Sequence, residues 1–212
     1  MSVASVVSVN VGEPRDVEWF GRIVRTAIWK EPVAGRIAVR GVNLAGDDQA
    51  DRRVHGGPDK AVYAYAVEDY AWWSDELGEV VGPATFGENL TTEGVDLSAA
   101  VIGERWQVGT TLLEVAQPRE PCAKLGLRMG AAAFRERFAQ AGRTGAYLRI
   151  VAEGDVGAGD PVEVIHRPEH GLTIAGLYQR VGQPTPEGLE LIVATPEVPE
   201  NVRVWAARQL RR

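Results

Sequence analysis

Cysteine is the residue that this sequence has least of: its 212 residues contain one cysteine, Cys122, together with two methionines and three histidines. A single cysteine excludes an intramolecular disulfide framework, and it cannot hold an iron–sulfur cluster. The chain also has no Cys-x-x-Cys or Gly-x-Ser-x-Gly motif, and two of its three histidines lie in the tail. An ordinary zinc site and a serine-hydrolase nucleophile are therefore not expected.

Long apolar runs and an excess of positive charge are missing too. No apolar stretch approaches the length that spans a bilayer, and the N-terminus has no basic segment of the kind that opens a signal peptide. The formal net charge is −6 and the pI is about 5.2, which disfavours nucleic-acid binding. We therefore expect a cytoplasmic protein that binds neither membranes nor nucleic acid.

The few basic residues are unevenly spread. Arg52, Arg53, His55 and Lys60 fall within nine positions of one another in an otherwise acidic chain. A local basic cluster in an acidic protein suggests a pocket for a small anionic ligand. For Arg52 and Arg53, a solvated loop that happens to contain arginines is an equal alternative.

The only cysteine stands in the segment Gln117–Leu125, between Pro118 and Pro121 on one side and Lys124 on the other. The prolines restrict the backbone of this loop, because each fixes its own φ and limits the residue before it. Arg119 and Lys124 would favour the thiolate, which is a nucleophile or a soft metal ligand. The alternative is a buried thiol that packs as a small apolar group.

Valine-rich alternation and glycine-containing turns predict a mainly β protein. The expected helices are Glu68 to Leu77, ended by Gly78, and Ala131 to Ala139. Many short strands with few helices favour a closed or nearly closed β-barrel with peripheral helices. The expected strands are Ser5 to Val11, Gly35 to Val42, Lys60 to Ala66, Arg105 to Val108, Thr111 to Gln117, Gly145 to Val151 and Pro161 to Ile165.

The pattern changes near His166, which divides the chain into a barrel domain at 1–165 and an extension at 166–212. From Leu172 onward the apolar residues recur at helical spacing. Three helices are expected, at Thr173 to Arg180, at Pro186 to Val193 with Thr185 as the N-cap, and at Pro199 to Leu210. This three-helix extension should pack on the barrel or on a partner subunit, the latter giving a homodimer.

Three further segments bear on chemistry. The glycines before Lys60 let the backbone approach a ligand, although the spacing is not that of a nucleotide P-loop. Phe86 to Thr91 offers Asn89 and backbone amides to a ligand, or forms an ordinary turn. Gly154 to Asp160 superficially suggests a dinucleotide fingerprint, but a strand-like segment follows it, so we interpret it as a tight turn. His55 is the histidine expected near Cys122.

In chain order these segments resemble the MOSC family, the domain related to the C-terminal part of molybdenum cofactor sulfurases. The resemblance rests on His55 to Val62, Phe86 to Leu90, Gly103 with Trp106, Arg119 to Leu125, and Gly145 to Tyr147 with Gly157 to Asp160. It covers about Ala34 to Ile165. The tail is similar to the helical extension of stand-alone bacterial members that resemble hydroxylaminopurine-resistance proteins.

The resemblance implies a β-barrel that carries a molybdenum cofactor in a basic cleft, with Cys122 as the metal ligand. It also implies reduction of N-hydroxylated compounds, such as N-hydroxylated purine bases. Lys60, Arg119 and Lys124 would neutralise the cofactor's phosphate, and the Gly87 backbone with Asn89 would fix the pterin. His55 would donate or relay a proton, which makes Cys122, His55 and Lys60 the expected catalytic residues.

Two further expectations concern the source of electrons and an alternative function. The chain shows no place for a flavin or an iron–sulfur cluster of its own, so an external electron-donor reductase is expected. The alternative function is a sulfur carrier or molybdenum-cofactor carrier in which Cys122 holds a persulfide. The same thiolate and cationic loop would serve either role. Tyr147 would be a pocket wall or an ordinary strand aromatic.

Overall fold

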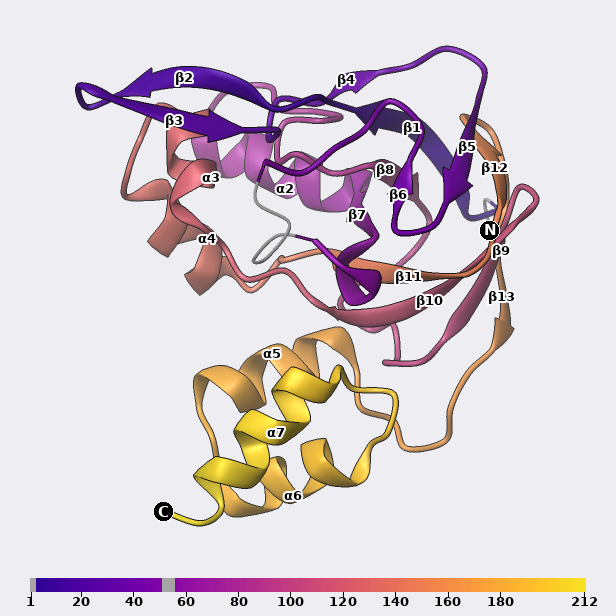
Figure 1. Ribbon diagram of the computed structural model, residues 1–212, viewed down its shortest axis with the longest axis vertical. Coiled ribbons are helices and arrows are strands. Elements are labelled where there is room, and N and C mark those ends of the chain that lie inside the picture. Colours follow the sequence, from indigo (N-terminus) through magenta and orange to yellow (C-terminus); the bar gives the residue numbers. More distant parts are fainter. Residues whose placement is uncertain (1–2, 51–55) are drawn as a thin grey trace.

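The main sheet of the protein has eight strands in the order β13-β9-β10-β11-β7-β8-β1-β4. The computed structural model describes residues 3–50 and 56–212, and Figure 1 shows its arrangement. β7 and β8 pair in parallel, whereas the other pairs of this sheet are antiparallel. The strands are β1 (Ser5–Val11), β4 (Glu31–Pro32), β7 (Val62–Ala66), β8 (Leu90–Glu93), β9 (Arg105–Val108), β10 (Thr111–Pro118), β11 (Ala146–Ala152) and β13 (Val162–His166).

Two smaller sheets complete the β structure. A three-stranded sheet has the order β12-β5-β6, and a two-stranded hairpin joins β2 to β3. Their strands are β2 (Arg15–Trp19), β3 (Arg22–Thr26), β5 (Arg36–Arg40), β6 (Asn43–Leu44) and β12 (Gly154–Gly157). The sequence patterns did not predict the hairpin, whose turn has positive φ at Phe20 (50°) and Gly21 (70°).

Three predicted segments differ clearly from the structure, and one of them is the helix predicted at Ala131 to Ala139, which is observed at Phe134–Ala141. The tight turn predicted from Gly154 to Asp160 is wrong in its first half, because β12 pairs with β5 there and gains ladder hydrogen bonds. Gly154 carries no side chain, and a Cβ at this position would collide with the Thr110 backbone. The strand predicted from Lys60 begins at Val62, since Pro58–Lys60 forms a 3₁₀ turn with Pro58 in its first turn.

Closure of the β structure into a barrel is not confirmed. The start of β1 meets the segment before β13 through an isolated bridge between Ser5 and Pro161, and the Val6 N–H donates to the Asp160 carbonyl at 2.9 Å. The two regions therefore touch, but among the described residues the strands form open sheets and not one closed ladder. The fold is sheet-dominant and mixed, with several helices around it.

β7 separates two apolar clusters, as its alternation predicted. Val62 and Ala64 point into the larger cluster, which is shared with the sheet and the C-terminal helices. Tyr63 and Tyr65 point into a smaller, aromatic cluster. In that second cluster the rings of Trp73 and Phe138 stack, with centroids 5.5 Å apart.

Among the described residues before 166, the structure has three α-helices. Gly78 ends α2 in the left-handed conformation, and its N–H donates to the Ser74 carbonyl, as the sequence predicted. The helix that begins directly after Cys122 was not predicted, because the prolines before it pointed to an extended loop. The helices are α2 (Val67–Leu77), α3 (Ala123–Arg128) and α4 (Phe134–Ala141).

The C-terminal extension forms the three predicted helices, α5 (Ile174–Gly182), α6 (Pro186–Ala194) and α7 (Glu200–Gln209). Thr173 and Thr185 cap α5 and α6 by accepting backbone N–H bonds through their hydroxyl oxygens. Figure 1 shows these helices gathered below the strands. Their buried apolar residues belong to the larger cluster, so the extension packs on the sheet and does not form a separate core.

Within the described ranges, no helix has both the length and the apolar content needed to cross a membrane.

Candidate functional site

A cavity of about 90 Å³ opens beside Cys122. Its walls come from the end of β3 and the residues after it, from the start of β7, from the segment before β8, and from the loop between β10 and α3. Cys122, Lys60, Gly87, Asn89, Arg119 and Lys124 all line it. The structure thus brings together the predicted site residues that it describes; His55 lies outside the described residues.

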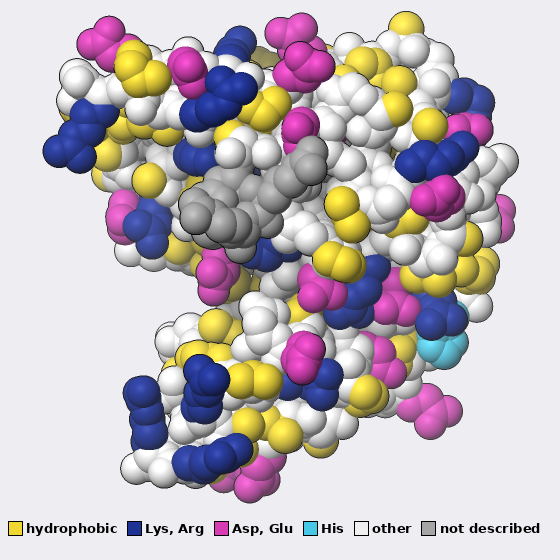
Figure 2. Space-filling view, in the orientation of Figure 1, with side chains coloured by type: hydrophobic (Ala, Val, Ile, Leu, Met, Phe, Trp, Pro, Cys, Tyr) yellow, Lys and Arg dark blue, Asp and Glu magenta, His cyan; other side chains and the backbone are white. Residues whose placement is uncertain are grey.

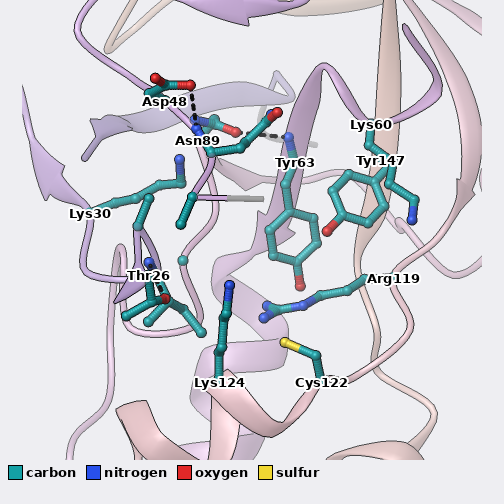
Figure 3. Close-up of a pocket in the computed structure, with 15 residues that line it drawn as sticks. Thr26, Lys30, Asp48, Lys60, Tyr63, Asn89, Arg119, Cys122, Lys124 and Tyr147 are labelled. Atoms are coloured by element: carbon teal, nitrogen blue, oxygen red, sulfur yellow. Dashed lines mark hydrogen bonds between the residues drawn. The ribbon is translucent and has the colours of Figure 1, made fainter. Parts of the chain in front are cut away.

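Cys122 is the N-cap of α3 and has an extended backbone (φ −112°, ψ 167°). Its side chain is partly buried. Figure 3 shows the Cys122 sulfur, the Arg119 guanidinium and the Lys124 amine directed toward the same space. A thiol flanked by cations can serve as a soft metal ligand or as a nucleophile.

Arg119 is buried, and its guanidinium donates to the Phe86 carbonyl. The same guanidinium lies 4.8 Å from the centroid of the Tyr63 ring. Aromatic packing and a backbone acceptor therefore stabilise the Arg119 charge. No carboxylate pairs with Arg119 among the ion pairs of the described residues. Such a cation remains available to an anionic ligand in the cavity.

Lys30 is a site residue that sequence reasoning missed. It lines the cavity and forms a buried ion pair with Asp47, the two side chains being 8% and 1% exposed. Burial lowers the pKa of Lys30, and the Asp47 charge opposes that effect. Lys30 stands between Trp29 and Glu31 in no recognisable motif, so the sequence offered no signal for it.

Asn89 lines the cavity, yet its amide is engaged by the protein. Its oxygen accepts from the Tyr63 N–H at 3.1 Å, and its nitrogen donates to Asp47 Oδ2 at 2.9 Å and to the Asn10 carbonyl at 3.3 Å. Asn89 therefore joins β7, β1 and the Lys30–Asp47 pair into one network. A direct contact of its side chain with a pterin stays a prediction.

Gly87 lets the chain pass close to the cavity wall. Its φ is +77°, and a Cβ there would lie 2.8 Å from Ile28 Cγ1 and 3.0 Å from the Ile28 carbonyl oxygen. Only glycine fits this backbone without displacing Ile28, which itself lines the cavity. Tyr147 also lines the cavity, 5.2 Å from the Tyr63 ring, so it is a pocket wall.

Behind the cavity, Glu88 is fully buried. Its carboxylate accepts from the Tyr70 hydroxyl at 2.7 Å, the Ala84 N–H at 2.6 Å and the Thr91 hydroxyl at 2.8 Å. Burial nevertheless raises the pKa of Glu88 above its ordinary value, and the hydrogen bonds only partly oppose this.

We expect this carboxyl to make folding pH-dependent. The folded state holds the Glu88 proton more tightly than the unfolded state, so its contribution to stability is complete at low pH and is lost as pH rises through the raised pKa. Relative to Glu88→Gln, the wild type should lose up to about 1.4 kcal/mol of unfolding free energy per pH unit in that window. Urea unfolding from pH 4 to pH 8 measures this. The exposed Glu79→Gln is the control, and a wild type that gains stability relative to Glu88→Gln as pH rises would contradict the assignment.

Comparison with known proteins identifies the family of this chain. The family model described as "MOSC domain" matches residues 51–163, a little more than half of the chain. The chain belongs to the MOSC domain family. It is 38% identical to YflK of Bacillus subtilis over 170 residues, which is 80% of this chain and 77% of that protein.

Two further MOSC relatives differ in the share of their own length that this chain matches. The structure of YiiM from Geobacillus stearothermophilus is 28% identical, with a TM-score of 0.81 over 98% of this chain and 99% of that one. A protein of Gibberella moniliformis named "Reductase" is 28% identical over 183 residues, which is 84% of this chain but 32% of that protein. The present chain therefore spans about a third of the length of that relative.

Proposed function

We propose that this MOSC protein is a molybdenum-cofactor-dependent reductase of N-hydroxylated compounds, with Cys122 as the metal ligand. The observation that carries the proposal is the convergence of one partly buried thiol with the cationic groups of Arg119 and Lys124 in a single cavity. The family is associated with this cofactor, and one relative is named a reductase.

The residues of the cavity fit such a group. Cys122 offers the soft sulfur donor that molybdenum accepts, and within the described ranges no cluster of three or more histidines, cysteines or carboxylates competes for a metal. Lys60, Arg119 and Lys124 provide positive charge for a phosphate, whereas the charge of Lys30 is balanced by Asp47. When bound, the cofactor supplies a centre that exchanges two electrons.

The proposed reaction balances as R–NHOH + 2 e⁻ + 2 H⁺ → R–NH₂ + H₂O. The N–O bond breaks, and the oxygen leaves as water. The electrons come from an external electron-donor reductase, and His55 stays the predicted proton donor. We expect this chemistry in the cytoplasm, and we expect that any homodimer involves the helical extension.

Metal and pterin content test the proposal. We expect close to one molybdenum and one pterin per chain in protein from a host with intact cofactor synthesis, and a loss of both in Cys122→Ala. Elemental analysis and release of the pterin measure this, beside mass spectrometry of Cys122. Absence of metal from both proteins, with a persulfide on Cys122, would instead support the sulfur or cofactor carrier.

A further inference from the structure

Two arginines share one tryptophan on the side of the molecule that carries the β2–β3 hairpin. The guanidinium carbon of Arg15 lies 4.5 Å from the centroid of the Trp29 ring, and that of Arg128 lies 5.6 Å from it. Arg15 is the first residue of β2, whereas Arg128 is the last residue of α3. In Figure 2, dark blue side chains stand at the upper left, where Figure 1 shows the hairpin above α3. Two segments that are distant in sequence thus bring two cations onto one ring.

Neither arginine has a carboxylate partner. No ion pair of the described residues includes Arg15 or Arg128. Asp16 follows Arg15 along β2, but the alternation of the strand directs it to the other face, where it pairs with Arg25 at 3.2 Å. The Nε atom of Arg128 is buried and has no hydrogen-bond partner. Within the described part of the chain, the two guanidinium groups are therefore left without a counter-ion.

The two like charges act on each other. Burial lowers the pKa of Arg128, and the positive charge of Arg15 lowers it further, whereas Tyr70 and Glu88 act in the opposite direction. Glu88 lies behind the cavity, and its carboxylate oxygens already accept three hydrogen bonds. An uncharged side chain would pack on Trp29 without this repulsion, and a bound anion would remove it. The pair is therefore better explained by a ligand than by packing alone.

The pair stands at the rim of the cavity that holds the cysteine. Thr26 pairs with Arg15 across the hairpin, and Lys124 precedes Arg128 by one helical turn; both Thr26 and Lys124 line the cavity. The residues on either side of Trp29 line it as well. The two arginines and the tryptophan are not themselves part of that lining. A ligand held by the pair would thus lie next to the cavity and outside it.

The chemistry of the pair matches a phosphate group. A guanidinium presents its N–H groups as a planar fork that fits two oxygens of a phosphate or a carboxylate. Two such cations that repel each other are neutralised best by a dianion, and a phosphate monoester carries a charge of about −1.5 to −2 at pH 7. A carboxylate brings one negative charge and would neutralise only one of the two arginines. The pair therefore favours phosphate.

We propose that Arg15 and Arg128, packed against Trp29, form a binding site for a phosphate group at the rim of the cavity. The ligand is inorganic phosphate or a phosphate monoester. Arg128 is half-buried and supplies a fixed cation, whereas Arg15 is exposed and supplies one that adjusts to the ligand. The site is separate from the cations that line the cavity, and it does not depend on the proposed reductase function.

NMR of the arginine Nε–H groups tests the site in the full chain at low salt, where exposed charges are least screened. Inorganic phosphate should shift the Arg128 Nε–H signal, identified by its loss in Arg128→Gln, with a Kd below about 1 mM. Arg15→Gln should raise that Kd at least about tenfold, because it removes charge-assisted hydrogen bonds. Arg25→Gln is the matched control, since Arg25 lies on the same hairpin and is already paired with Asp16. Lys60→Gln removes a cation of the cavity and should leave the Kd unchanged.

Phenyl phosphate and phenol distinguish the two sources of the phosphate group. Equal affinity for inorganic phosphate and phenyl phosphate would assign the site to the free anion, and tighter binding of phenyl phosphate without a response to phenol would assign it to a monoester. The site would be overturned by no shift with phosphate, by an unchanged Kd in Arg15→Gln, or by an equal rise in Lys60→Gln, which would place the anion in the cavity. An equal response to chloride at the same ionic strength would show an adventitious ion only and overturn it too. Thermal unfolding of each variant checks the fold.

Discussion

Replacement of Cys122 by serine is expected to lower kcat/KM for N-hydroxylated bases by at least about 100-fold, because even residues that only support a metal ligand commonly contribute 10- to 100-fold. Serine retains the size of the side chain but lacks the soft sulfur donor. Steady-state rates with a chemical reductant, measured at matched protein concentration, give this value.

The same variant controls for folding. Cys122 occupies the N-cap of α3 with an extended backbone, and serine is among the residues preferred at that position. The midpoint of thermal unfolding should therefore stay the same or rise slightly, while activity falls. If the serine variant retained activity within threefold of the wild type, Cys122 would have no role in the reaction and would be a packing residue.

The sequence predicted residues that the structure brings to one cavity, because those residues are concentrated in short segments. Arg119, Cys122 and Lys124 lie on one loop, and the Gly87–Asn89 segment follows directly after Phe86. β7 was predicted with the correct faces, since Tyr63 and Tyr65 alternate with Val62 and Ala64. The cap of α6 was also predicted, because the Thr185 hydroxyl accepts from the N–H three positions later; Thr173, predicted as the first residue of its helix, caps α5 in the same way.

The residues that escaped prediction depend on contacts that are distant in sequence. Lys30 joins the site through Asp47 and, beyond it, Asn89. Nothing near Lys30 in the chain indicates a partner 17 positions away. β12 was mistaken for a turn for the same reason: its glycines favour a turn locally, but β5 supplies a pairing edge. Local propensity was overruled by tertiary pairing.

The arrangement of the sheets could not be predicted from the sequence patterns either. Alternation predicts strands, but it does not say how the edges of sheets meet. Here β4 ends one edge of the main sheet, and β12 joins β5 in a separate sheet. The sequence therefore predicted many of the strands. It could not predict whether they close into a barrel, because closure depends on strand pairings that no local pattern encodes.

Lys30→Met is expected to cost about 3–5 kcal/mol of unfolding free energy, the range found when one partner of a buried ion pair is removed. The Asp47 carboxylate would keep its bonds from the Gly12 N–H at 2.8 Å and Asn89 Nδ2 at 2.9 Å, but it would lose its counter-charge at 1% exposure. Urea unfolding with an unchanged m-value measures the loss. A loss below 1 kcal/mol would contradict the burial of this pair.

The double variant Lys30→Met/Asp47→Asn separates stability from cofactor binding. Asparagine retains an acceptor for the Gly12 N–H and removes the orphaned charge, so the double variant should be more stable than Lys30→Met alone. Lys30 also lines the cavity, and restoring stability does not restore its amine there. We expect Lys30→Met to lower the pterin content, and the double variant to keep that low content while the unfolding midpoint recovers. Recovery of both together would assign Lys30 a purely structural role.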